Sequence, residues 1–222
     1  MIHRPGAAFF DMDRTVLLVD SGALWVKFLR RRNELSRLQM LRALSWVVRY
    51  KLALLDLEAL AQKLAANLTG KPEADMIKKC QGWYRDEIEP AIAPAARLAI
   101  AEHRRQGERV VLLTTSTPYV AELLGRTLAL DDVLCSRLEV IDGRFTGQIQ
   151  HPLCFGHGKV THAERWAQAA GLSLADCAFY TDSYNDVPVL RRVGRPFVVN
   201  PDERLRRLAQ KQGWPISTWS AI

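Results

Sequence analysis

The sequence contains few cysteines and no long uninterrupted apolar run, and both absences exclude classes of protein. Its four cysteines stand far apart and form no Cys-x-x-Cys pair, so we expect reduced, mostly buried thiols in a cytoplasmic protein. The longest apolar region, residues 38–57, is interrupted by the charged residues Arg42, Arg49, Lys51 and Asp56. A membrane-spanning helix does not tolerate this density of charge, so the region is not expected to cross a bilayer.

The sequence shows no internal repeat and no low-complexity segment, and a secretory leader is not expected. Residues 1–10 are too short for a signal peptide and lead directly into an acidic motif. His151 and His162 have no partner at metal-ligand spacing, so a zinc site is not expected. With 222 residues, 48% of them hydrophobic, the chain predicts one large domain or a core with a small insert.

The chain is basic, with a net charge of +7 and a pI near 9.5. A positive surface favours anionic partners such as phosphate esters, nucleic acid or acidic membranes. Apart from Arg30-Arg31-Arg32 the basic residues are scattered, so nucleic acid is not expected as a partner. No sequence feature indicates an oligomeric state.

The hydrophobic pattern changes twice along the chain. Residues 7–10 form a short apolar run typical of a buried strand, whereas residues 21–88 repeat apolar side chains at three- and four-residue steps, which predicts three to five helices. After Pro94, strand and helix patterns alternate, and Asp142-Gly143 predicts the turn of a hairpin. These elements predict an α/β fold: a doubly wound, mainly parallel sheet with an inserted all-helical block.

Two acidic clusters follow short apolar runs. Asp11 and Asp13 come directly after the first predicted strand, and Asp182 and Asp186 follow the apolar run 177–180. Because ligands of open α/β sheets bind beyond the carboxyl ends of the strands, we expect these carboxylates at one site. Mg²⁺ prefers oxygen ligands and takes few of them from protein, so the two clusters predict a magnesium site.

Thr114 and Lys159 extend this pattern. Thr114 directly follows the apolar strand predicted for residues 109–113, and Lys159 stands at the expected start of a helix. Each has a simpler explanation when taken alone, Thr114 as a strand-end hydroxyl or helix cap and Lys159 as a solvated lysine. Their positions between the two acidic clusters favour a joint catalytic role.

Together these motifs resemble the haloacid dehalogenase-like (HAD) superfamily, and within it the phosphoserine-phosphatase-like branch. The resemblance covers nearly the whole chain, because four motifs occur in order and the hairpin around residues 142–147 and the helical block also match. It implies a Rossmann-like catalytic core of residues 1–15 and 93–222 and a helical cap of residues 16–92.

The resemblance also implies roles for the motif residues. Asp11 would be the nucleophile that forms an aspartyl-phosphate, and Asp13 would act as general acid and then as base. Lys159 would neutralise a phosphate oxygen and orient Asp11. Thr114 would donate its hydroxyl to the phosphoryl group, with Ser116 as the alternative in a shifted register.

Mg²⁺ is the implied cofactor. It would be held by Asp11, the backbone carbonyl of Asp13 and Asp182, and would reduce the repulsion between carboxylate and phosphate. Asp186 would support the waters of the metal or Lys159 from behind, and Asn185 would belong to the same outer layer.

The expected activity is hydrolysis of a small phosphorylated metabolite resembling phosphoserine or histidinol phosphate. Thr115 would assist phosphate binding through its amide. Asp20 and Trp25 follow the first motif closely and are candidate substrate-binding residues, since a carboxylate at position 20 would favour an ammonium or imidazolium group. The alternatives are helix capping for Asp20 and helix packing for Trp25.

Two other functions stay open. The basic, apolar helix around residues 38–54 could lie on an anionic membrane, as in a lipid-phosphate phosphatase. Its alternative is a cap helix packed on its neighbours, and stable membrane association is not expected. The other function is a non-catalytic module that binds a phosphorylated ligand, but every catalytic position is filled.

Overall fold

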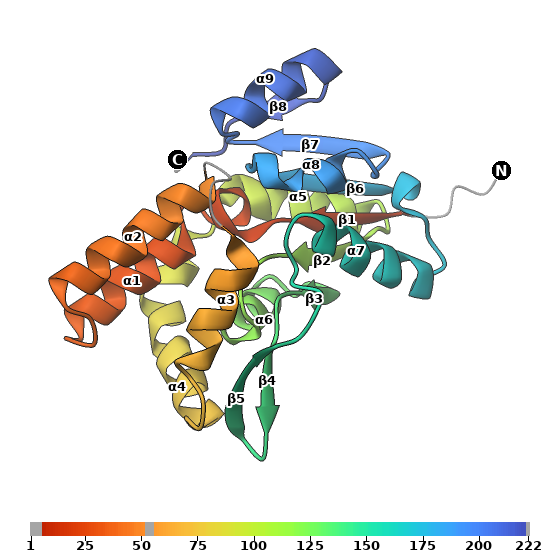
Figure 1. Cartoon of the computed structure of the whole chain (residues 1–222). Helices are drawn as coiled ribbons and strands as arrows, with labels where there is room; N and C mark the ends of the chain where they lie inside the picture. The colour runs from red at the N-terminus through yellow and green to blue at the C-terminus, as the bar shows by residue number, and fades with distance from the viewer. Residues whose placement is uncertain (1–5, 52–55, 221–222) are drawn as a thin grey trace.

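The computed structural model describes residues 6–51 and 56–220, and its centre is a six-stranded sheet (Figure 1). The strands stand in the order β3, β2, β1, β6, β7 and β8, and every pair is parallel. This confirms the predicted fold class. The strands are β1 (Ala7–Phe10), β2 (Arg109–Leu113), β3 (Asp132–Leu134), β6 (Cys177–Thr181), β7 (Arg195–Val199) and β8 (Ile216–Ser217).

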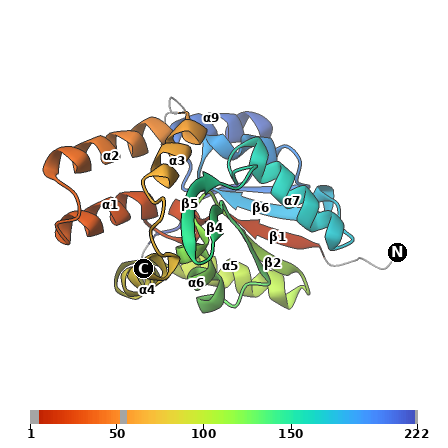
Figure 2. The ribbon, with the colours of Figure 1, turned by 60° about the horizontal axis from the view of Figure 1, so that its bottom comes forward.

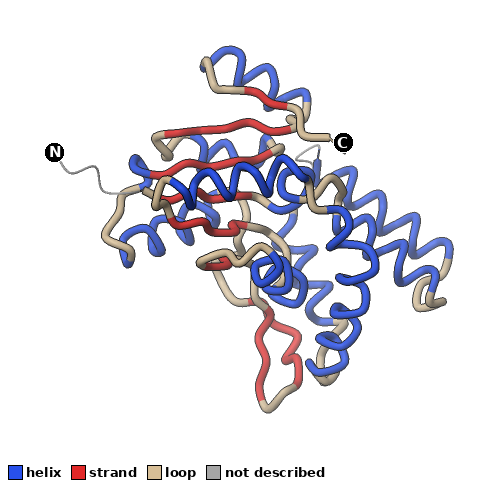
Figure 3. Tube along the Cα trace, turned by 180° about the vertical axis from the view of Figure 1, so that it is seen from behind, coloured by secondary structure: helices blue, strands red, loops and turns tan. Residues whose placement is uncertain are grey.

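Helices cover both faces of the sheet (Figures 2 and 3). Ala8 and Phe10 of β1 pack with the helices of one face, and Ala7 and Phe9 pack with those of the other. A strand enclosed on both faces has no solvent-facing position, which explains its continuous apolar sequence. The helices are α5 (Pro94–Arg105) and α6 (Pro118–Thr127) on the first face, and α7 (His157–Ala169), α8 (Val187–Leu190) and α9 (Glu203–Gln212) on the second.

The register of the sheet aligns the carboxyl ends of its three central strands. Phe10 of β1 lies opposite Leu112 of β2 and Tyr180 of β6. Each of these strands ends within one residue of that level, so the side chains that follow reach the same edge. These following residues are Asp11, Thr114 and Asp182.

An all-helical block separates β1 from β2 in the sequence. The chain leaves and re-enters the core side by side, because Leu17 and Ile92 form an antiparallel bridge and the Ala93 N–H donates to the Val16 carbonyl. The first two helices extend away from the sheet as a pair (Figure 1). In the described residues the block contains α1 (Ser21–Arg31), α2 (Arg37–Lys51), α3 (Leu57–Ala66) and α4 (Glu73–Trp83), within the predicted three to five helices.

A two-stranded hairpin, β4 (Leu138–Ile141) and β5 (Arg144–Ile149), extends from the core to these inserted helices (Figure 2). The N–H of Gly70, between α3 and α4, donates to the carbonyl of Phe145 over 2.8 Å. Gly147 has a φ of 88°, and a Cβ there would lie 2.1 Å from a side-chain oxygen that follows α3. Glycine therefore allows the hairpin to approach the helices this closely.

The short elements α8 and β8 have no clear signal in the sequence. α8 is a single turn, too short to display a helical period, and β8 pairs only two residues with β7. No helix in the described ranges combines the length and apolar character needed to cross a membrane. Residues 52–54 of the expected surface helix lie outside the described residues.

Candidate active site

The central strand ends bring carboxylates and a hydroxyl together at one edge of the sheet. Asp11 follows β1, Thr114 follows β2 and Asp182 follows β6, and β1 lies between the other two strands. Asp11 is 7% exposed and Thr114 is 3% exposed, so both side chains are largely shielded from solvent. The Asp11 N–H donates to the Tyr180 carbonyl over 2.9 Å, which extends the pairing of β1 with β6 to the site.

Lys159 is buried between two of the carboxylates. Its Nζ lies 2.7 Å from Asp11 Oδ1 and 2.8 Å from Asp186 Oδ2, and its side chain is 2% exposed. A buried ammonium needs such partners, because an unpaired buried charge is very unfavourable. The preceding Gly158 allows close packing, since a Cβ there would lie 1.9 Å from the Leu153 carbonyl oxygen. The alternative of a solvated lysine is therefore wrong.

Thr181, the last residue of β6, holds Asp186 in place. Its buried hydroxyl donates to Asp186 Oδ2 over 2.7 Å and accepts from the Ser183 N–H over 3.1 Å. The Thr114 hydroxyl likewise accepts from the Ser116 N–H over 3.1 Å. Because Thr114 is the acceptor in that bond, its own proton stays available to an anion.

Asp13 is held by the first residue of α1. The Ser21 N–H donates to Asp13 Oδ1 over 2.9 Å, and the Ser21 hydroxyl donates to Oδ2 over 3.1 Å. The backbone turns sharply between them: Arg14 has a φ of 54°, and its N–H donates to the Val19 carbonyl. This turn brings together two residues that belong to the core and to the inserted helices.

Burial of so many carboxylates raises their pKa values. Burial, opposed by the charge of Lys159, raises the pKa of Asp11 to about 6. Burial and the charge of Asp20 raise the pKa of Asp13 to about 7. Burial and the charge of Asp11 hold the pKa of Asp182 well above its usual range. Asp13 can therefore carry a proton near neutral pH, as a general acid must.

The donor set at the strand ends fits a divalent cation. Asp11 and Asp182 repel each other, and a cation between them would relieve that repulsion. Arg14 Nε lies 3.3 Å from Asp182 Oδ2. In residues 6–51 and 56–220, no three His, Cys, Asp or Glu side chains are arranged to hold a metal by themselves. The expected ion therefore needs the Asp13 carbonyl and water as further ligands, which Mg²⁺ accepts.

Asp20 and Trp25 make structural contacts on α1. Asp20 Oδ1 accepts from the Ala23 N–H over 2.9 Å, as the capping alternative predicts. Trp25 packs against Phe28 and Trp83, with ring centroids 5.3 and 4.9 Å away, as the packing alternative predicts. Asp20 nevertheless lies close enough to Asp13 for its charge to raise the pKa of that carboxyl group.

Thr115 and Asn185 lie in the two turns that follow β2 and β6. Thr115 is half-buried directly after Thr114. Asn185 is half-buried before Asp186, and its N–H donates to Ser183 Oγ over 3.3 Å. Both residues thus adjoin the cluster without forming its centre.

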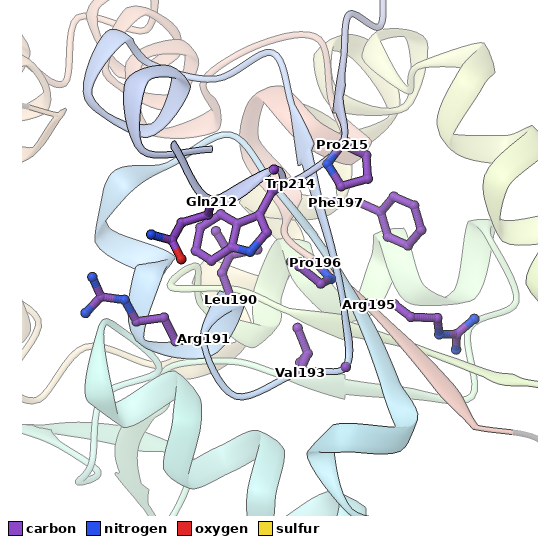
Figure 4. A pocket seen from close by; sticks show the side chains of 11 residues that line it. Leu190, Arg191, Val193, Arg195, Pro196, Phe197, Gln212, Trp214 and Pro215 are labelled. Atoms are coloured by element: carbon purple, nitrogen blue, oxygen red, sulfur yellow. The ribbon is translucent and has the colours of Figure 1, made fainter. Parts of the chain in front are cut away.

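A cavity of about 570 Å³ lies at the opposite edge of the sheet, where β7 and β8 begin. Figure 4 shows Arg191, Gln212 and Trp214 on one side of β7 and Arg195 and Phe197 on the other. No carboxylate lines this cavity. It is therefore separate from the predicted site.

A smaller cavity of about 250 Å³ lies between α3 and the loop before Lys159. It is lined by Glu58 of α3, His151 of the loop before α7, and His157 and Gly158 at the start of α7, among others. His151 Nδ1 lies 3.0 Å from Glu58 Oε1. The inserted helices thus adjoin the segment that carries the lysine.

Thr181 and Ser21 belong to the cluster but have weak signals in the sequence. Thr181 ends an apolar strand just as Thr114 follows one, so the rule that selects Thr114 could also have selected Thr181. Ser21 resembles any first-turn helix residue, and its contact with Asp13 depends on a turn that no local pattern shows.

Comparisons with known proteins agree with this arrangement. A family model described as haloacid dehalogenase-like hydrolase matches residues 8–191, which include both acidic clusters and Lys159. A phosphoserine phosphatase of Mycobacterium tuberculosis is 34% identical over 220 residues, 97% of this chain and 71% of that protein. A histidinol-phosphatase of Neisseria meningitidis is 26% identical over 214 residues, 94% and 96% of the two chains. A crystal structure of a Bordetella pertussis protein of unknown function has a TM-score of 0.85 at 31% identity, covering 95% and 96%.

Proposed function

The chain belongs to the haloacid dehalogenase-like hydrolase family, and we propose that it is a Mg²⁺-dependent phosphatase that transfers the phosphoryl group of a small phosphomonoester first to Asp11 and then to water. The observation that carries this proposal is the buried contact of 2.7 Å between Asp11 and Lys159. It supplies a carboxylate whose position is fixed by a cation that also attracts phosphate. Asp13, with a raised pKa, supplies the proton donor.

In the first step an Asp11 oxygen attacks phosphorus, the bond from phosphorus to the leaving oxygen breaks, and Asp13 gives that oxygen its proton. Lys159 binds Asp11 Oδ1, so Oδ2 is the attacking atom. The Thr114 hydroxyl and the Thr115 N–H donate to phosphoryl oxygens. In the second step Asp13 takes a proton from water, water attacks phosphorus, and Asp11 and inorganic phosphate are released.

Mg²⁺ fits Asp11, the backbone carbonyl of Asp13 and Asp182, and when bound it would lessen the repulsion between phosphate and carboxylates. Asp186 and the adjacent Asn185 support this arrangement from behind. Asp186 does so by fixing the lysine that orients the nucleophile.

We assign substrate selection to residues 16–92 as a cap and the chemistry to residues 1–15 and 93–222 as the core. Relatives carry the names phosphoserine phosphatase and histidinol-phosphatase, and both named substrates bear a protonated amine or imidazole. Asp20, at the start of α1, supplies a carboxylate for such a group, and Trp25 lies about one and a half helical turns further along. The proposed substrate class is therefore small phosphomonoesters with a nearby cationic group.

The test is phosphate release from p-nitrophenyl phosphate and from a panel of phosphorylated metabolites, with and without Mg²⁺. Turnover should require a divalent ion, Asp11→Asn should abolish it, and Asp13→Asn should lower it by roughly a hundredfold or more. Asp75→Asn, at an exposed carboxylate of α4, is the matched control and should behave like the wild type. Undiminished turnover in EDTA after metal removal, or near-normal rates in Asp11→Asn, would refute the proposal.

A phosphorylated lipid is the second candidate substrate, because α2 exposes apolar side chains. Leu38 and Leu41 are 64% and 61% exposed, and the exposed Arg37 and Arg42 are next to them in sequence. An amphipathic surface of this kind binds anionic membranes through apolar burial and charge. Co-sedimentation with anionic vesicles should be lost in Leu38→Ser/Leu41→Ser; a wild type that stays in solution would remove this candidate.

A further inference from the structure

Ser21 contacts Asp13 more fully than the start of a helix requires. Ser21 is 5% exposed although it is the first residue of α1, and it bonds to both carboxyl oxygens of Asp13, through its N–H over 2.9 Å and its hydroxyl over 3.1 Å. The first N–H groups of a helix lack partners within the helix, and a preceding side chain usually accepts from them. Here Asp20 accepts from Ala23, whereas the Ser21 N–H is directed to Asp13.

We propose that Ser21 is a positioning residue for Asp13, an inference that rests on the proposed function with Asp13 as proton donor. Two bonds to one carboxyl group fix both its position and its plane. A proton donor with a fixed orientation avoids the entropy that free rotation of the carboxyl group would cost as the phosphorus–oxygen bond breaks. Ser21 acts through Asp13 and takes no part in bond making or breaking.

As a positioning residue for the proton donor, Ser21 should affect substrates whose leaving group needs a proton and spare those whose leaving group does not. Nitrophenolate is stable as an anion and leaves without a proton, whereas an alkoxide must be protonated as it leaves. The quantity kcat/KM reports the steps up to departure of the leaving group, so hydrolysis of the aspartyl-phosphate does not enter it. Loss of Ser21 should therefore lower kcat/KM for alkyl phosphates and spare it for aryl phosphates.

Three substitutions of Ser21 distinguish the hydrogen bond of its hydroxyl from the hydrogen bond of its N–H. Ser21→Ala removes the hydroxyl bond, Ser21→Thr keeps both groups, and Ser21→Pro removes the N–H and hydroxyl together. Proline suits this position, because the first helical residue tolerates it and Asp20 has the extended backbone (φ −99°, ψ 109°) that a residue before proline adopts. Ser36→Ala is the matched control, since the Ser36 hydroxyl caps the start of α2 by accepting from the Gln39 N–H.

The assay compares the fastest alkyl phosphate of the metabolite panel, starting from O-phosphoserine, with p-nitrophenyl phosphate. For the alkyl phosphate we expect Ser21→Ala to lower kcat/KM roughly tenfold, the effect of one hydrogen bond. Ser21→Pro should lower it roughly a hundredfold, the contribution of a well-placed general acid. For the aryl phosphate both should change kcat/KM by less than about twofold. Ser21→Thr and Ser36→Ala should match the wild type on both substrates.

Thermal unfolding of each variant checks that it is folded. If Ser21→Pro does not fold, the comparison of Ser21→Ala with Ser21→Thr still tests the role of Ser21. Equal losses on both substrates, or an alkyl phosphate rate unaffected by Ser21→Ala, would overturn the inference. A wild type that hydrolyses no alkyl phosphate would overturn the proposed function itself, and the inference with it.

Discussion

Replacing Lys159 with methionine keeps most of the side-chain length but removes the charge between Asp11 and Asp186. The Nζ–O distances of 2.7 and 2.8 Å and the near-complete burial of the lysine set the size of the effect. At about 2.8 Å, two unit charges interact by about 6 kcal/mol at an effective dielectric constant of about 20, against about 1.5 kcal/mol in bulk water. We therefore expect Lys159→Met to lower the free energy of unfolding by about 3–5 kcal/mol, as for other broken buried ion pairs.

Asp186→Asn should change the free energy of unfolding in opposite directions in the wild type and in Lys159→Met. In the wild type it removes one partner of Lys159 but leaves the Asp11 pair and a neutral partner for the Thr181 hydroxyl, so the expected loss is about 1–2 kcal/mol. In Lys159→Met, Asp186 and Asp11 are two buried carboxylates without a cation. Neutralising Asp186 should then raise the free energy of unfolding by about 1–2 kcal/mol.

Urea unfolding of all four proteins, followed by the fluorescence of the six tryptophans, measures this cycle. A pH of about 8 favours the ionised carboxylates, including Asp11 with its pKa of about 6. EDTA keeps metal ions from replacing the missing lysine charge. If Asp186→Asn destabilises both backgrounds equally, the two side chains are energetically independent and the reasoning fails.

Further predictions concern the rest of the core. All four cysteines are buried and burial raises the pKa of each thiol to about 11 or above, so a thiol reagent should label the folded chain slowly and all four sites after unfolding. Gly158→Ala should lower both the melting temperature and the activity, because the added Cβ would collide with a backbone carbonyl. Gly82→Ala in α4 is the control and should lower neither, because a Cβ there has open space around it. Burial raises the pKa of Glu108, but the hydrogen bonds from His103 and Arg195 lower it more, so the net pKa is below the ordinary value. The ionised Glu108 therefore stabilises the folded chain above the ordinary pKa of a glutamate, and this contribution is lost as the pH falls. Urea unfolding of Glu108→Gln should show a loss of about 2 kcal/mol at neutral pH and a weaker decline on acidification than the wild type.

The residues at the strand ends could be predicted because their signal is local. A short apolar run followed by polar side chains marks the carboxyl end of a buried strand, and this rule identifies Asp11, Thr114 and Asp182 without knowledge of the fold. The strand predicted for residues 109–113 agrees with β2 at both ends, and the apolar run 177–180 lies within β6. Alternation of strands and helices then determines which edge of the sheet these residues share.

Local sequence patterns do not give the partners of these residues, because contacts depend on distances in space; only the family resemblance implied that Lys159 would meet Asp11 and that Asp186 could support Lys159. Lys159 and Asp186 are 27 residues apart in the sequence and 2.8 Å apart in the fold. Asp20 and Trp25 follow the first motif closely, and the structure adds that Asp20 caps α1 and that Trp25 packs on Trp83. A sequence pattern does not distinguish a side chain that faces a ligand from one that faces another helix.

The hydrogen bonds between the β4–β5 hairpin and the α3–α4 connection limit which segments can be transferred from one member of this family to another, in evolution or by design. Gly70 donates to Phe145, and Glu73 donates to Gly143, so an insertion made after β1 is paired with a hairpin made after β3 (Figure 2). A graft of residues 16–92 alone would arrive without its partner strand and leave these backbone groups unpaired. If residues 16–92 select the substrate, as proposed above, then a transfer of substrate preference would have to move two segments together, 16–92 and 138–149.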